Sequence, residues 1–388
     1  MDFIKILPVE LSEFILQHLT TRELLNVTLV SKSWNKFISE SSNLMKNIKF
    51  VFDLINDKFP LTSERKIFLI ESPRIYQHLE ISRVDTKYLK DIYDIYKLKR
   101  NQVKSLKLHH LNFISTKDLA DFFGLFNLTV EKIIFGFINV KIIHELDCDE
   151  FKNLKSLYLI SNESINCSSI FEKCKNLIEL YIVGRSKEIK SIKIIVTLLQ
   201  QNEKLKVLDL SLETGYQILE NKEIISKIPF KLHTFRAKIW SKTYFRNFFL
   251  SQINSIQTLK LHRIDYLEDL QTIFTMQNLK SVDLGLVQEL DLTNINLTLN
   301  TSIEHLEFFD MNCKIETIRL IITSAPNTKD MKIFCMTREI MQFVSLKMKS
   351  LKSLTMFIPM SYNMNDFPAP IDSVKSILKS TKIKYIFI

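Results

Sequence analysis

Glycine is scarce in this chain, whose 388 residues include only Gly124, Gly136, Gly184, Gly215 and Gly285, with no two within ten residues of each other. Nucleotide-binding loops of the Walker and Rossmann types need several closely spaced glycines, because backbone N–H groups must approach the phosphates. The G-x-S-x-G turn of many hydrolases likewise needs two glycines close together. The sequence therefore excludes these nucleotide-binding sites and this catalytic motif.

Metal-binding and redox motifs are also missing. The five cysteines, Cys148, Cys167, Cys174, Cys313 and Cys335, form no C-x-x-C pair, and the eight histidines form no H-x-x-x-H motif. Adjacent residues on a strand point to opposite faces, so His109 and His110 are poor co-ligands, and we expect His109 to face solvent. We therefore expect no metal, no cofactor, and free thiols in a reducing compartment.

Long apolar runs are absent, and none approaches the roughly 18 residues of a membrane helix. The start, MDFIKILPVEL, has no charged segment followed by a long apolar one, so we expect no signal peptide, no membrane contact, and a cytoplasmic or nuclear location. Lys and Arg exceed Asp and Glu by 53 to 43, a mild excess that does not by itself indicate nucleic acid. Nucleic-acid binding stays a minor hypothesis, whose mark would be an affinity that falls steeply with salt.

What the chain does contain is a repeated phrase, L-x-x-L-x-L. Clean copies start at Val103, Leu154, Leu205, Ile256, Leu279 and Leu351, and weaker copies at Tyr76, Val130, Leu177, Leu232, Ile303, Thr328 and Ile383. Successive starts lie 23 to 28 residues apart, except for a last gap of 32. A fixed period in this range is typical of leucine-rich repeats.

The phrase has a local physical meaning. The alternation L-x-L predicts a short strand with one apolar face, which a single unit cannot bury without stacked neighbours. Helical spacing recurs between the strands, at 88–96, 119–123, 192–199, 267–274, 315–322, 340–344 and 374–378, whereas 361–370 is predicted to be a polar loop. We predict an α/β horseshoe of about 12 to 13 degenerate repeats over residues 76–388. The alternative is a set of ordinary amphipathic strands in a globular domain.

Residues 1–50 have a different pattern, which predicts three short helices. The first follows Pro8 and carries the apolar stripe Leu11, Phe14, Ile15 and Leu19. The second starts at Thr20, with Glu23 at capping-box spacing, and the third starts near Ser31. The apolar residues are too many for one small core, so we expect some to cover a partner; the alternative is a simple cap for the repeats. Residues 51–75 are predicted to be a stiff linking segment with a helix at 63–70.

These N-terminal residues resemble a known motif. The order Leu7-Pro8, Glu10-Leu11, Leu24-Leu25, Val30-Ser31 and Trp34 is similar to an F-box over about 40 residues. An F-box followed by repeats resembles the leucine-rich-repeat class of F-box proteins. The resemblance implies that the F-box docks on the Skp-type adaptor of a cullin-based (SCF-type) ubiquitin ligase while the repeats hold a protein substrate. The positions that it carries over as adaptor-binding are Leu7, Pro8, Leu11, Leu24, Leu25, Val30 and Trp34.

The residues between the apolar positions of each strand should face the inner curve of the array. There the sequence predicts an apolar and aromatic patch of Ile134, Tyr158, Ile160 and Tyr181, beside a basic patch of Arg236, Lys238 and Lys260. Contiguous exposed apolar residues often mark interaction sites, so we predict substrate binding on these residues. The alternative is an inner face covered by loops or by the C-terminal tail.

Two functions remain open. The first is a non-catalytic substrate receptor of a ubiquitin ligase, and the second is a leucine-rich-repeat scaffold that binds a protein partner and is unrelated to ubiquitin. Burial distinguishes them. Leu7, Pro8, Leu24, Leu25 and Trp34 should be largely buried if the helices only cap the repeats, and should belong to an exposed apolar strip if they dock an adaptor.

Overall fold

The computed structural model describes most of the chain. The described residues are 4, 6–46, 48–53, 63–72, 74, 76–84, 86–98, 103–111, 116–136, 150–161, 172–184, 192–211, 228–238, 244–264, 266–287, 296–308, 314–334, 338–358 and 382–387. The predicted loop at 361–370 and helix at 374–378 lie outside them. The chain divides into a first compact unit, Met1–Leu180 with Arg185–Asn202, and a second, Tyr181–Gly184 with Glu203–Ile388.

The first unit begins with short helices, α1 (Val9–Leu16), α2 (Thr21–Val27), α3 (Lys32–Glu40) and α4 (Ser42–Met45). The N-caps are those expected: Thr20 and Glu23 form a capping box, and the Ser31 hydroxyl accepts the Trp34 N–H at 3.3 Å. The fourth helix was not predicted. The Ser41 hydroxyl accepts the Leu44 N–H at 3.1 Å and so starts a new turn directly after α3.

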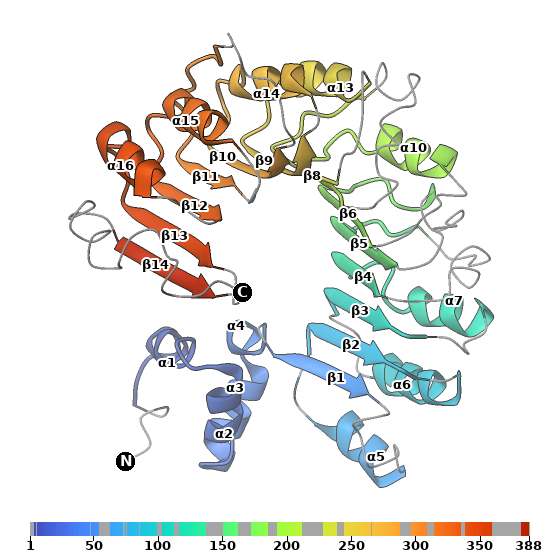
Figure 1. The fold of residues 1–388 in the computed structure, drawn as a ribbon. Coiled ribbons are helices and arrows are strands. Elements are labelled where there is room, and N and C mark those ends of the chain that lie inside the picture. The colour runs from blue at the N-terminus through green and yellow to red at the C-terminus, as the bar shows by residue number, and fades with distance from the viewer. Residues whose placement is uncertain are drawn as a thin grey trace. The chain divides into compact units, whose positions relative to one another are not determined.

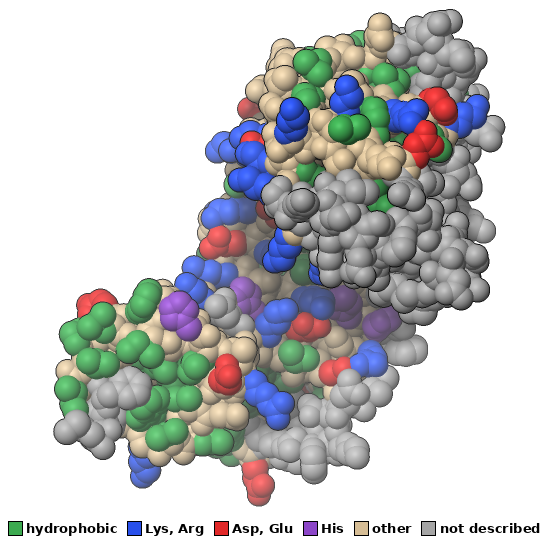
Figure 2. Space-filling view, turned by 60° about the vertical axis from the view of Figure 1, so that its left-hand side comes forward, with side chains coloured by type: hydrophobic (Ala, Val, Ile, Leu, Met, Phe, Trp, Pro, Cys, Tyr) green, Lys and Arg blue, Asp and Glu red, His purple; other side chains and the backbone are tan. Residues whose placement is uncertain are grey.

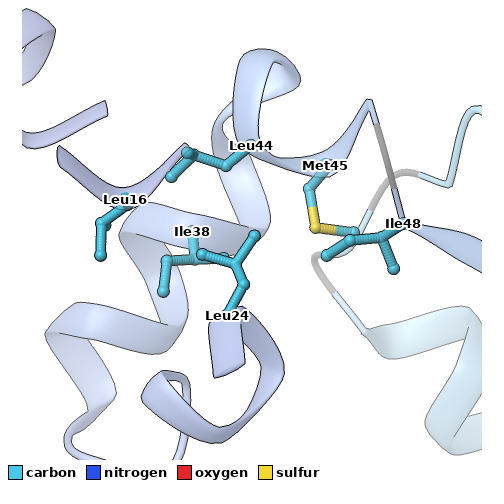
Figure 3. Packing of buried hydrophobic residues seen from close by; sticks show 6 residues of the cluster. All are labelled: Leu16, Leu24, Ile38, Leu44, Met45 and Ile48. Atoms are coloured by element: carbon cyan, nitrogen blue, oxygen red, sulfur yellow. The ribbon is translucent and has the colours of Figure 1, made fainter. Parts of the chain in front are cut away.

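These helices share one small core (Figure 3). The buried residues of this cluster come from all four helices and from the residue before the first strand: Leu16, Leu24, Ile38, Leu44, Met45 and Ile48. Tyr76 packs against the same cluster, and its ring lies 4.6 Å from that of Phe50. Because Tyr76 lies two residues before strand β2 (His78–Ser82), the helical core continues into the sheet of the first unit.

The repeat region of the first unit is a parallel sheet with helices on one side (Figure 1). Its strands are β1 (Lys49–Asp53), β2 (His78–Ser82), β3 (Ser105–His109), β4 (Lys132–Gly136) and β5 (Ser156–Ser161), each paired with the next in chain order. Its helices are α5 (Ser63–Glu71), α6 (Thr86–Leu98), α7 (Thr116–Gly124) and α10 (Ile192–Gln201). Strand β6 (Glu179–Gly184) has its first two residues in this unit.

Strand β1 lies where the sequence placed the boundary between residues 1–50 and 51–75. Phe50 and Phe52 stand opposite Leu79 and Ile81 of β2, so β1 is a further copy of the strand pattern. The copy is hard to recognise because Asn47 occupies the position where the phrase has its first apolar residue. The linking segment is therefore shorter than predicted, although its helix begins at Ser63 as expected.

The second unit repeats the same arrangement. Its strands are β7 (Val207–Leu210), β8 (Thr234–Ala237), β9 (Thr258–Ile264), β10 (Ser281–Val287), β11 (His305–Phe308), β12 (Asp330–Phe334), β13 (Ser353–Ile358) and β14 (Lys382–Phe387), each parallel to its chain neighbour. Its helices are α13 (Tyr244–Gln252), α14 (Leu267–Phe274), α15 (Ile315–Ser324) and α16 (Arg338–Lys347), which lie on one side of β9–β13 (Figure 1). Ile383 stands opposite Leu354, the second apolar position of its phrase, so the last copy starts three residues before the predicted Ile383.

The apolar positions of the phrase build the core. Leu154, Leu157 and Leu159 are at most 4% exposed, and the clean copies on both units show the same burial. One backbone carbonyl per repeat fixes the register, as Glu131 does by accepting the N–H groups of both Lys155 and Ser156. The intervening strand residues, as at Lys107 and Tyr158, are half-buried on the opposite face of the sheet.

Candidate partner-binding surfaces

Helix α1 presents its apolar stripe to solvent. Leu11, Phe14 and Ile15 are 51%, 58% and 47% exposed, whereas the buried face consists of Ser12 and Leu16. The helix is held in this orientation through Glu13, whose carboxylate accepts hydrogen bonds from the Ser41 hydroxyl and, at 2.7 Å, from the Asn43 amide. An apolar helix face that the rest of the fold leaves uncovered is a candidate docking surface.

The turn between α2 and α3 is also apolar and exposed. Leu29 is 83% and Val30 66% exposed, whereas the preceding Thr28 is 5% exposed. The Thr28 hydroxyl donates to the Leu25 carbonyl at 2.6 Å and accepts from the Arg74 guanidinium at 2.9 Å. Figure 2 shows hydrophobic side chains gathered over the N-terminal helices, at the lower left of the view. We call the exposed apolar residues of this region, Ile6, Val9, Leu11, Phe14, Ile15, Leu29 and Val30, the N-terminal apolar surface.

The seven residues predicted to bind an adaptor have three different environments. Pro8, Leu11 and Val30 are exposed; Leu7, Leu25 and Trp34 are half-buried; and Leu24 is 5% exposed in the core. Leu24 therefore supports the helices and has little surface left for a partner. Phe14, Ile15 and Leu29 are exposed as well, although the adaptor-binding prediction from the sequence did not name them. The stripe of Phe14 and Ile15 was visible in the sequence, but its direction was not.

The N-terminal helices are tied to the first strands by polar contacts as well as by the shared core. The Arg74 guanidinium reaches both Thr28 and, at 3.3 Å, the Asn35 side chain of α3. Arg74 lies two residues before Tyr76, which packs in the helical core. These contacts join helices and sheet within one compact unit.

Residues 4–50 match the F-box-like family model. The chain thus carries an F-box-like domain, and its bounds enclose α1 to α4 together with every residue of the N-terminal apolar surface. No curated protein matches the chain.

The predicted aromatic patch is partly assembled in the first unit. Ile134 of β4 stands opposite Tyr158 of β5, and Ile160 stands opposite Gly136. The Lys132 ammonium lies over the Tyr158 ring, 4.3 Å from its centroid, and the Tyr158 hydroxyl is 3.5 Å from the Glu179 carboxylate. Tyr181 is half-buried on β6 and belongs to the second unit. The patch in the first unit is therefore apolar at Ile134 and Ile160 and charged at its border.

The predicted basic patch lies on β8, on the residue directly after it (Lys238), and on β9 of the second unit. Arg236 stands opposite Lys260, so two cations are neighbours across the strands. Each has a carboxylate on its outer side: Arg236 is 3.8 Å from Asp209 of β7, and Lys260 pairs with Asp283 of β10. The sequence prediction missed these ion pairs. Lys238 has no ion pair within the described part of the chain.

His109 does not simply face solvent: its ring lies where a side chain on Gly136 would stand, it is half-buried, and burial together with Lys107 holds its pKa below the usual value of 6.5. Among the described residues, no three His, Cys, Asp or Glu side chains come together as metal ligands. The described helices include none that is long and apolar enough to cross a membrane.

Proposed function

We propose that this protein is the substrate-recognition subunit of an SCF-type cullin ubiquitin ligase. Its F-box-like domain docks on a Skp-type adaptor, and through it on a cullin scaffold, while the repeats bind a protein substrate. The protein itself makes no covalent bond. It acts in the cytoplasm or nucleus by holding lysines of the substrate at high effective concentration near a charged ubiquitin carrier.

The observation that carries the proposal is the N-terminal apolar surface within the F-box-like match. Of the five residues expected to separate the two functions, Leu24 is buried, Leu7, Leu25 and Trp34 are half-buried, and Pro8 is exposed, so they alone do not decide between them. Their neighbours Leu11, Phe14, Leu29 and Val30, which a simple cap would turn inward, are each more than half exposed. Burying one large aliphatic or aromatic side chain is worth about 1.5–3 kcal/mol, so a partner that covers several of them gains enough for stable association. This exposure supports adaptor docking over the repeat-scaffold alternative.

The attachment of the domain supports the same function. A substrate receptor works by geometry, because the substrate must be presented at a fixed place relative to the ligase. Arg74 and Tyr76 join the F-box-like helices to the first strands by hydrogen bonds and packing. A flexible tether would lower the effective concentration of the substrate lysines.

The second part of the proposal is that the strands and helices after the F-box-like domain are leucine-rich repeats of an α/β solenoid. Its support is that copies of the L-x-x-L-x-L phrase coincide with parallel strands that pair in chain order. The helices between these strands lie on one side of the sheet in each unit (Figure 1). Such arrays offer the strand face as a broad binding surface. We place substrate binding on the strand face of each unit, at Ile134, Tyr158 and Ile160 in the first unit and at Tyr181, Arg236, Lys238 and Lys260 in the second.

The test is co-purification of the full chain with a purified Skp-type adaptor. One variant replaces Leu11, Phe14 and Val30 by Ser, all of them exposed, so that folding is spared. A matched control replaces Ile67 and Phe68 of α5 by Ser. These two residues are 53% and 72% exposed and lie outside the F-box-like match. We expect a stoichiometric complex for the wild type and the control, and at least a tenfold loss of affinity for the first variant.

Two outcomes would contradict the proposal. If the first variant is folded and binds the adaptor as well as the wild type, the N-terminal apolar surface is not the docking site. If the wild type is folded and monodisperse but does not bind the adaptor, the repeat-scaffold function replaces the ligase function.

A further inference from the structure

Strands β8 and β9 carry a dense group of hydrogen-bond donors on one face of the second unit. Thr234 stands opposite Thr258, and Arg236 stands opposite Lys260. His262 follows two residues after Lys260 on β9, and alternation along the strand places it on the same side. Lys238 follows directly after the last residue of β8, Ala237. We call these six residues, Thr234, Arg236, Lys238, Thr258, Lys260 and His262, the β8–β9 surface. Its ionisable side chains are all bases.

Two cations stand side by side at the centre of this group. Lys107 with Glu80 in the first unit, at 2.9 Å, and Lys332 with Glu307 in the second, at 3.0 Å, are pairs of opposite charge on adjacent strands. Arg236 and Lys260 stand opposite each other as like charges, as Asp283 and Glu307 do on β10 and β11. Like charges directly opposite each other on neighbouring strands repel. A carboxylate placed between Arg236 and Lys260 would remove that repulsion.

The carboxylates already present do not fill this place. Asp209 lies on the far side of Arg236 and also accepts the Ser211 N–H at 3.0 Å, so part of its hydrogen-bonding capacity is used locally. Asp283 lies on the far side of Lys260 and is only 9% exposed. Arg236, Lys260 and Lys238 keep substantial exposed surface. The surface therefore has a net positive charge and unused donors.

We propose that the β8–β9 surface binds an acidic, Asp- and Glu-rich segment of a protein partner, with Arg236, Lys238 and Lys260 as the contacts. Carboxylates accept charge-assisted hydrogen bonds from guanidinium and ammonium groups. Donors spaced by about 5 Å across the strands and about 7 Å along them fit several carboxylates of one chain. A single doubly charged phosphoryl group would be repelled by the carboxylates of Asp209 and Asp283, which lie on either side. The inference rests on the proposed function in one respect, that the partner is the substrate.

The experiment measures binding of a fluorescein-labelled oligoglutamate peptide to the full chain. The variant replaces Arg236, Lys238 and Lys260 by Gln. The matched control is Lys332→Gln, an equally exposed lysine of the same strand face in an ion pair of its own. We expect oligoglutamate to bind with an affinity that falls with salt, the triple variant to lose at least tenfold, the control to stay within about twofold, and an oligoglutamine peptide not to bind.

Three results would overturn the inference. Equal binding by the triple variant and the wild type removes the β8–β9 surface as the site. Tighter, variant-sensitive binding of a phosphoserine peptide assigns the surface to phosphoryl groups, and the same result with duplex DNA assigns it to nucleic acid. Because the triple variant leaves the F-box-like domain intact, it should still bind the adaptor. A chain that binds oligoglutamate but no adaptor therefore refutes the proposed function and leaves this inference standing.

Discussion

Leu11 and Ser12 are neighbours in α1 with opposite environments: the leucine is 51% exposed, whereas the serine is fully buried. This reverses the usual preference of the two residue types. The reversal leaves the Ser12 hydroxyl without a hydrogen-bond partner in the described part of the chain. It leaves Leu11 available to a partner. We interpret α1 as a helix that lowers the stability of the free protein in order to keep an apolar face exposed for a partner.

The first prediction follows from the buried hydroxyl. Burying an unpaired hydroxyl costs about 1–3 kcal/mol, so Ser12→Ala should raise the free energy of unfolding by about 1 kcal/mol. Urea denaturation measures this change in the free energy of unfolding. Ser39→Ala is the matched control, because the Ser39 hydroxyl is equally buried but donates to the Asn35 side chain at 3.2 Å, and it should lose about 1 kcal/mol. A loss of stability in Ser12→Ala as large as that in Ser39→Ala would contradict the assignment.

The second prediction concerns the orientation of α1. Glu13→Ala removes the acceptor of the Ser41 and Asn43 hydrogen bonds, which join α1 to the start of α4. We expect a loss of about 1–2 kcal/mol in stability, and a weaker complex with the adaptor because α1 no longer holds its apolar stripe in place. Glu10→Ala, in the exposed first turn of the same helix, should change neither quantity. If Glu10→Ala weakens the complex as much, charge and not orientation is responsible.

The third prediction concerns a buried amide between repeats. Asn202 is 1% exposed; its side chain accepts the Leu177 N–H at 2.7 Å and donates to the Cys174 and Leu198 carbonyls at 2.8 and 2.7 Å. Asn202→Ala strands these backbone groups in the core, so we expect a loss of about 3 kcal/mol. Faster hydrogen exchange at the Leu177 N–H in this variant would show that the loss of stability arises at this hydrogen bond.

The control for that prediction is Asn176→Ala. The Asn176 amide makes one exposed hydrogen bond, to the Lys152 carbonyl at 3.1 Å, and water can replace it. We expect a loss below about 1 kcal/mol. Comparable losses of stability in the two variants would show that the contribution of Asn202 to stability does not depend on the burial of its amide.

Much of the local structure could be predicted from the sequence, because it depends on neighbours in the chain. The L-x-L alternation marks strands such as β5, and the side chains of Thr20 and Ser31 mark the starts of α2 and α3. The phase of the last phrase was misjudged at Ile383, because several residues of β14 are apolar and only its pairing with Leu354 selects one register.

The outward direction of α1 could not be predicted, because it depends on tertiary contacts. Both faces of α1 contain apolar residues, and the Glu13 contacts with Ser41 and Asn43 decide which face is buried. The ion pairs around the basic patch are different. Asp209 and Asp283 occupy the same strand position as Arg236 and Lys260, so aligning the repeats would have revealed them.

The last prediction is a pH dependence on the β8–β9 surface. Burial, followed by Lys238 and Lys260, lowers the pKa of His262 from 6.5, and Asp283 opposes this. The unfolded chain therefore binds a proton at His262 more readily than the folded chain does. The stability that neutral His262 contributes is fully present above about pH 6.5, and it is lost as the pH falls through the pKa of His262 in the folded chain. A bound acidic segment favours the imidazolium instead, so binding is coupled to proton uptake.

Oligoglutamate should therefore bind more tightly as the pH falls from about 7.5 to about 5.5, while its carboxylates are still ionised. His262→Gln should flatten this profile, and it should also reduce the loss of stability on acidification. His233→Gln, an exposed histidine outside the β8–β9 surface, should keep both. The two readouts separate a local role from a general effect of charge: a profile that stays steep in His262→Gln would mean that another group takes up the proton.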